Sequence, residues 1–121
     1  RTRLMLNQCK SIPRNVSLVS PFAYLKFVAL LSEAAAVITD SGGVSEETTA
    51  LGIPCITLRT STERMETVDL GTNVLLGENI KDLHHYANLI RNGRWKPSRI
   101  PDRWDGLSGQ RIIDVLSKYI M

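Results

Sequence analysis

The chain has 121 residues, of which 43% are hydrophobic and 22% charged, and its formal net charge is +3. These values are ordinary for a globular domain, or for part of a larger one, and so small a positive excess argues against nucleic acid as a partner. No apolar run approaches the length needed to cross a bilayer, and no signal peptide is recognisable, so no membrane association is expected.

Short apolar runs alternate with stretches of helical spacing along the whole chain. Ser20 and Pro21 have the pattern of a helix N-cap followed by proline at the first helical position, and Gly52 is placed to end a helix. Strands that alternate with helices predict an α/β fold with a parallel, Rossmann-like sheet. In chain order we expect a helix within 1–10, a strand at 16–20, a helix at 21–35, a strand at 37–39, a helix at 44–51, a strand at 54–58, a helix at 64–70, a strand at 73–76, and helices at 80–91 and within 106–120.

The segment Asp40-Ser-Gly-Gly43 is the first candidate for a binding site. It connects a predicted strand to a predicted helix, and parallel sheets bind ligands where strands end and such loops begin. Glycine lets backbone N–H groups approach an anion, and the helix N-terminus adds a positive partial charge. With the hydroxyl of Ser41, this pattern is compatible with a phosphate site. The alternative is an ordinary tight turn in which Ser41 only caps the helix.

Two carboxylates, Glu46 and Glu47, follow in what is expected to be the first turn of the helix. Adjacent helical residues point about 100° apart, so these two side chains cannot share one role. One of them is expected to face the pocket and accept two hydrogen bonds from the diol of a ribose, while the other is solvated or structural. The pattern therefore favours a nucleotide over a bare phosphate.

The loop after the next strand, residues 59–64, is rich in hydrogen-bond donors. Arginine and hydroxyl groups at a strand end suit phosphate oxygens or sugar hydroxyls. The alternative is a polar surface loop with a Glu63–Arg64 ion pair.

The remaining reactive residues do not form a recognisable site. Cys9 and Cys55 lack the spacing of a disulfide framework or a zinc site, and Cys55 is predicted to be a small core residue. Two unpaired thiols favour a cytoplasmic location. His84 and His85 fall in the middle of a predicted helix and are expected at the surface. We therefore expect no metal, no cofactor and no Ser-His-Asp arrangement.

The stretch TDSGGVSEETTALGIPCITLRTSTERMETVDLGTNVLLG closely resembles the nucleotide-binding core of UDP-N-acetylglucosamine 2-epimerases of the non-hydrolysing type. The match covers residues 20–77 and departs at Met65, where that family usually has proline. The resemblance implies the carboxyl-terminal domain of a two-domain fold of the glycosyltransferase B type, with the active site between the domains. It implies that residues 1–121 are a partial UDP-binding domain that lacks the first two strands of that domain. The catalytic amino-terminal domain is then also expected to be missing from this chain. The strand at 16–20 is then expected to have lost its neighbours.

The resemblance also implies roles for single residues. Ser41, Gly42 and Gly43 would hold the diphosphate of UDP, Glu47 the ribose, and Phe27 would pack near the uracil. No residue of this chain is expected to be catalytic. Arg59, Thr62, Glu63 and Arg64 would line the cleft.

The activity implied for the parent protein is that of an isomerase. It would interconvert UDP-N-acetylglucosamine and UDP-N-acetylmannosamine by elimination and re-addition of UDP, in the cytoplasm and as a homo-oligomer, with the dimer as the expected form. The isolated chain is expected to be inactive. The alternatives are a hydrolysing 2-epimerase, a sugar-nucleotide glycosyltransferase, and a non-catalytic nucleotide-binding module.

Overall fold

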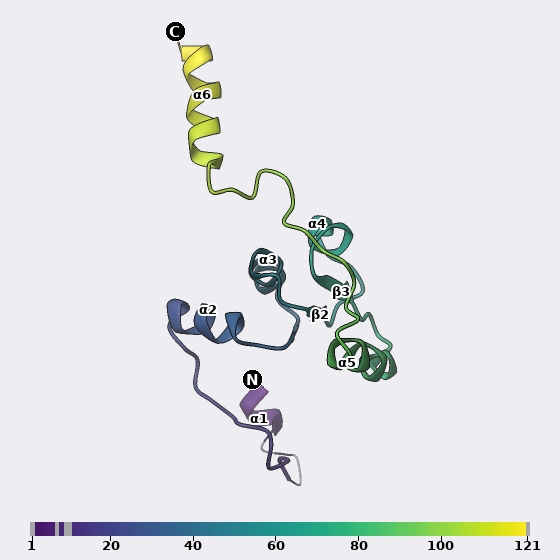
Figure 1. The fold of residues 1–121 in the computed structure, drawn as a ribbon. Helices are drawn as coiled ribbons and strands as arrows, with labels where there is room; N and C mark the ends of the chain where they lie inside the picture. Colours follow the sequence, from purple (N-terminus) through teal and green to yellow (C-terminus); the bar gives the residue numbers. More distant parts are fainter. Residues whose placement is uncertain (1, 7, 9–10, 121) are drawn as a thin grey trace.

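The computed structural model describes residues 2–6, 8 and 11–120, whose arrangement is drawn in Figure 1. In this part of the chain, three strands form a parallel sheet in the order β1-β2-β3. They are β1 (Val37–Thr39), β2 (Cys55–Thr57) and β3 (Asn73–Leu75). Val37 lies beside Cys55, and Cys55 beside Asn73. The predicted α/β class with a parallel sheet is confirmed.

Helix α3 lies at the centre of the molecule, where it contacts all three strands. Its last residue precedes Gly52, which adopts the left-handed conformation with φ 72° and ends the helix as predicted. The other helices lie near their predicted positions. They are α1 (Thr2–Leu6), α2 (Tyr24–Ser32), α3 (Gly42–Leu51), α4 (Met65–Asp69), the 3-10 turn η1 (Ile80–Asp82), α5 (Leu83–Arg91) and α6 (Ser108–Ile120).

The core around the sheet is unusually rich in polar side chains. Thr57 Oγ1 donates a hydrogen bond to Asn73 Oδ1 at 2.7 Å, and Asn73 Nδ2 donates to Thr67 Oγ1 at 3.1 Å. Thr67 Oγ1 in turn donates to the carbonyl oxygen of Arg64 at 2.7 Å. This chain of hydrogen bonds, which we call the threonine relay (Thr57, Asn73, Thr67), connects β2 and β3 to the start of α4.

Gly71 lets α3, α4 and β3 approach one another closely. A Cβ atom at this position would lie 2.7 Å from the carbonyl oxygen of Thr67 and still closer to the side chain of Thr49. Since Thr49 and Thr67 are themselves buried, neither can move aside without disturbing the core. Close packing, not a turn, explains this glycine.

Two predictions before the sheet are wrong. Residues 16–20 form no strand, and Val16 and Val19 are 47% and 60% exposed. Among the described residues no strand lies beside this segment, so a strand here would have no ladder partner for its backbone groups. Helix α2 begins only at Tyr24, with Ala23 as its N-cap, instead of directly after Ser20 and Pro21.

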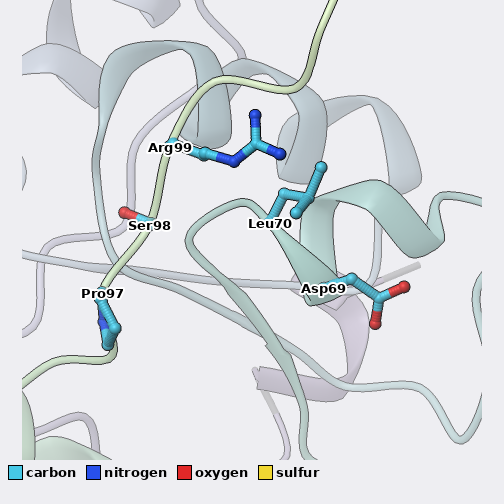
Figure 2. A pocket seen from close by; sticks show the side chains of 5 residues that line it. All are labelled: Asp69, Leu70, Pro97, Ser98 and Arg99. Atoms are coloured by element: carbon cyan, nitrogen blue, oxygen red, sulfur yellow. The ribbon is translucent and has the colours of Figure 1, made fainter.

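The chain after α5 runs back across the molecule along α4. Trp95 Nε1 donates to the carbonyl oxygen of Thr72 at 2.9 Å, and the Arg99 N–H donates to that of Leu70 at 2.8 Å. A cavity of about 240 Å³ remains between this segment and α4, lined by Asp69, Leu70, Pro97, Ser98 and Arg99 (Figure 2). Because Asp69 and Leu70 precede β3, the cavity lies at the amino end of the strands, away from the predicted site.

Helix α6 projects from the rest of the molecule (Figure 1). Arg111, in the first turns of this helix, pairs with Asp105, and Arg111 Nη1 lies 2.9 Å from Asp105 Oδ1. Hydrogen bonding from Arg111 and from the Leu107 N–H keeps the pKa of Asp105 below its usual range. Its predicted apolar face is present but exposed, and Ile113 is 61% accessible. No helix among the described residues has both the length and the apolar character to cross a membrane.

Candidate functional site

The first turn of α3 begins directly after the carboxyl end of β1. Ser41 is its N-cap, with φ −95° and ψ 125°, and its Oγ accepts a long hydrogen bond of 3.5 Å from the Val44 N–H. The cap itself is held in place because the Ser41 N–H donates to Thr39 Oγ1 at 3.0 Å. The capping role of Ser41 is therefore confirmed, and a cap of this kind leaves room for an anion at the same helix end.

Gly42 and Gly43 belong to the helix and not to a loop before it. The predicted start at residue 44 is two residues late. In the described part of the chain, the N–H groups of both glycines have no hydrogen-bond partner. A Cβ atom on Gly43 would meet only Ser41 Oγ, at 4.0 Å, so the space in front of this residue is open. Two free donors at a helix N-terminus, with open space in front of Gly43, are suited to an anionic ligand.

The loop of residues 59–64 folds over the start of α3. A Cβ atom on Gly42 would lie 3.3 Å from Glu63 Oε1 and 3.9 Å from Arg64 Cγ. Within the loop, Thr62 Oγ1 accepts a hydrogen bond of 3.1 Å from the Arg64 N–H. The structure thus brings together the two segments that the sequence singled out separately.

The ion pairs of this loop differ from the predicted one. Glu63 Oε2 lies 3.8 Å from Arg59 Nη1, a pair whose side chains are largely exposed. Arg64 does not pair with its neighbour Glu63. Its Nε lies 3.2 Å from Glu46 Oε1, so Arg64 connects the loop to α3. The predicted Glu63–Arg64 pair is wrong because the two adjacent side chains point to different partners.

Glu46 and Glu47 lie in the second turn of α3, one turn later than predicted, because the helix starts earlier. They diverge as expected. Glu46 pairs with Arg64, which is the structural role foreseen for one of the two carboxylates. Glu47 is half-buried, and its carboxylate forms no ion pair or hydrogen bond with another described residue. It lines a cavity of about 270 Å³ together with Glu46, Ala50 and Trp104.

Trp104 was not anticipated as a neighbour of this site. It belongs to the irregular segment after α5, and no local pattern in the sequence links that segment to α3. Phe27 lies half-buried on α2, a helix that contacts α3. The role expected for Phe27 near a base stays a prediction.

The other reactive residues lie elsewhere. Cys55 is completely buried in β2, and burial raises the pKa of its thiol, an effect that hydrogen bonds with Thr48 and Thr57 partly oppose. Cys55 is thus a core residue, as predicted, whereas Cys9 lies outside the described residues. His84 and His85 are exposed on α5, as expected. His84 borders an apolar cavity of about 480 Å³ between α5 and the faces of β1 and β2.

Comparisons with known proteins agree with this geometry. Residues 1–117 match the family described as UDP-N-acetylglucosamine 2-epimerase. The chain is 40% identical over 106 residues to the UDP-N-acetylglucosamine 2-epimerase of Methanocaldococcus jannaschii, covering 86% of this chain and 28% of that protein. It is 46% identical over 109 residues to the enzyme of the same name from Yersinia pestis, covering 87% and 29%. The chain thus spans less than a third of the length of these relatives.

Comparison with solved structures finds enzymes of the same name. The crystal structure of the M. jannaschii enzyme in complex with UDP-GlcNAc and UDP superposes with a TM-score of 0.75 at 38% identity, covering 95% of this chain and 31% of that one. The Neisseria meningitidis enzyme bound to UDP-GlcNAc gives a TM-score of 0.67 at 34% identity, covering 87% and 29%. The predicted glycosyltransferase B type of fold is the fold of these neighbours.

Proposed function

The chain belongs to the UDP-N-acetylglucosamine 2-epimerase family, and on this premise we propose that residues 1–121 are part of the carboxyl-terminal, UDP-binding domain of such an enzyme. The whole protein interconverts UDP-N-acetylglucosamine and UDP-N-acetylmannosamine. A proton is removed from C2 of the sugar and UDP leaves C1; UDP then adds back to C1 of the glycal while a proton is delivered to C2 from the opposite face. The part of the protein formed by this chain holds UDP while it leaves and returns.

The diphosphate binds at the start of α3. Support comes from the unpartnered N–H groups of Gly42 and Gly43 at the helix start, beside the hydroxyl of Ser41 and the open space in front of Gly43. Negative charge grows on the diphosphate as the bond to the sugar breaks. Donors that are already aimed at this position stabilise the growing charge without having to reorganise. This pair of free N–H groups is the observation that carries the proposal.

Glu47 binds the two hydroxyls of the ribose. It is half-buried beside a cavity and has no partner of its own among the described residues. A carboxylate in this state gains two hydrogen bonds when a diol binds, which offsets its partial desolvation. Phe27 on the neighbouring helix packs near the uracil. The loop residues line the cleft on the other side: Arg59, Thr62, Glu63 and Arg64.

We further propose that the enzyme works in the cytoplasm as a homodimer. The buried, unpaired thiol of Cys55 is compatible with a reducing compartment. The exposed apolar side chains on α6 provide surface that a second subunit or another domain can cover.

Calorimetric titration of the full-length protein with UDP and with 2′-deoxy-UDP tests the ribose assignment. Glu47→Ala is expected to weaken UDP binding by about tenfold or more, the usual loss for a hydrogen bond to a charged group. Binding of 2′-deoxy-UDP, which has no diol, should weaken much less. Glu33→Ala is the matched control, because Glu33 is exposed and precedes the amino end of β1, whereas the site follows its carboxyl end. Equal losses for both ligands would contradict the assignment.

Product analysis tests the reaction itself. The full-length protein is incubated with UDP-N-acetylglucosamine, and the products are separated by chromatography. UDP-N-acetylmannosamine is the expected product. Free N-acetylmannosamine with UDP would instead identify a hydrolysing enzyme, and unchanged substrate would favour a binding module.

A further inference from the structure

We propose that Glu46 is a positioning residue for the diphosphate, because it holds the guanidinium group of Arg64 beside the first turn of α3. The inference rests on the proposed UDP site and adds a role for a carboxylate that does not itself touch the ligand. It also accounts for a negative charge so close to an anion site.

The side chain of Arg64 is held by Glu46. Arg64 Nε lies 3.2 Å from Glu46 Oε1, and this nitrogen is buried without a well-aligned hydrogen bond to any described residue. The carboxylate of Glu46 therefore supplies the charge that compensates a desolvated guanidinium nitrogen. Removal of that carboxylate leaves the nitrogen buried without its counter-charge, and this favours movement of the side chain toward water.

The backbone of Arg64 is held independently by the threonine relay. Thr67 Oγ1 donates to the Arg64 carbonyl oxygen, and Asn73 connects Thr67 to Thr57 in the sheet. The three side chains of the relay are completely buried, so their hydrogen bonds do not exchange with water. Arg64 is thus fixed at its main chain by the relay and at its guanidinium by Glu46.

The position of Arg64 directs it toward the proposed diphosphate. Its Cγ lies 3.9 Å from where a Cβ atom of Gly42 would be, so the side chain passes directly over a residue whose N–H is free. A guanidinium group has five N–H donors in a planar fork, and the contact with Glu46 through Nε leaves the terminal nitrogens for other acceptors. A second acceptor at this place is the diphosphate that the two glycines bind.

The direction in which diphosphate affinity changes when Glu46 is neutralised distinguishes a positioning role from simple charge repulsion. A carboxylate that merely lies near a diphosphate repels it, so neutralising the carboxylate would tighten binding. A carboxylate that orients an arginine helps the diphosphate to bind, so neutralising it weakens binding. Glu46→Gln has nearly the same size and hydrogen-bonding reach and removes only the charge.

The test measures the affinity of the full-length protein for UDP and for inorganic pyrophosphate. Glu46→Gln is expected to weaken both by roughly tenfold, within the range for a coupled pair in contact. In an Arg64→Ala background, the same substitution should change affinity by less than about twofold, because the partner is gone. Glu33→Gln, an equal charge change at an exposed site, is the control and should have no effect.

Other results overturn the inference. Unchanged or tighter binding in Glu46→Gln, or equal losses with and without Arg64, would show that Glu46 does not act through Arg64. If Glu46→Gln does not fold, Glu46→Asp keeps the charge but shortens the side chain, and full pyrophosphate affinity in that variant would contradict the positioning role. If the unaltered protein binds neither UDP nor pyrophosphate, the proposed UDP site itself fails, which is a separate and recognisable outcome.

Discussion

The region around the sheet and the two flanking segments differ sharply in how their side chains are packed. Between residues 37 and 77, even the polar side chains of Thr57, Thr67 and Asn73 are buried and hydrogen-bonded. In residues 11–20 and in α6, apolar side chains such as Val19 and Ile113 are exposed. The region that forms the candidate site therefore contains a buried, hydrogen-bonded interior, whereas the flanks present apolar surface that other parts of a larger assembly can cover.

The largest effect on the free energy of unfolding is expected when one glycine in each region is replaced by alanine. Gly71→Ala places a Cβ atom against Thr49 and the Thr67 carbonyl oxygen, and should destabilise the fold by about 3 kcal/mol or more, as overpacking against buried groups does. Gly109→Ala in α6 meets no atom within 4 Å and should be neutral or stabilise the helix by up to about 1 kcal/mol. Urea unfolding measures both. Similar losses in the free energy of unfolding for the two variants would contradict the difference in packing between the two regions.

A comparable effect on the free energy of unfolding is expected from shortening one isoleucine in each region. Ile56 in β2 is 1% exposed and Ile113 in α6 is 61% exposed. Ile56→Ala should cost about 2–5 kcal/mol because it leaves a cavity in the core. Ile113→Ala should change the free energy of unfolding by about 0.5 kcal/mol or less. A large loss at Ile113 would instead reveal that α6 is packed against a partner in solution, which sedimentation measurements at increasing protein concentration would identify.

The order of elements was predictable because its signals are local. Apolar runs mark β1, β2 and β3, and Gly52 ends α3 as its position indicates. The start of α3 was missed because two glycines in succession are poor helix formers. In the structure the Ser41 cap stabilises a helical turn that propensity alone disfavours.

The arrangement of the site was less predictable because it depends on contacts between distant residues. Neither the Glu46–Arg64 pair nor the position of Trp104 beside Glu47 follows from spacing along the chain. The strand predicted at residues 16–20 fails for a related reason. Its apolar pattern is suitable, but a strand needs a neighbour, and the described residues provide none beside it.

The most direct test of the central claim follows the backbone amides of the two free glycines. The full-length protein, labelled with nitrogen-15 in glycine, is titrated with UDP and observed by NMR. We expect the amide signals of Gly42 and Gly43 to move with UDP concentration, while those of Gly93 and Gly109 stay in place. Saturable UDP binding that leaves the Gly42 and Gly43 signals unchanged would contradict a diphosphate site at the start of α3.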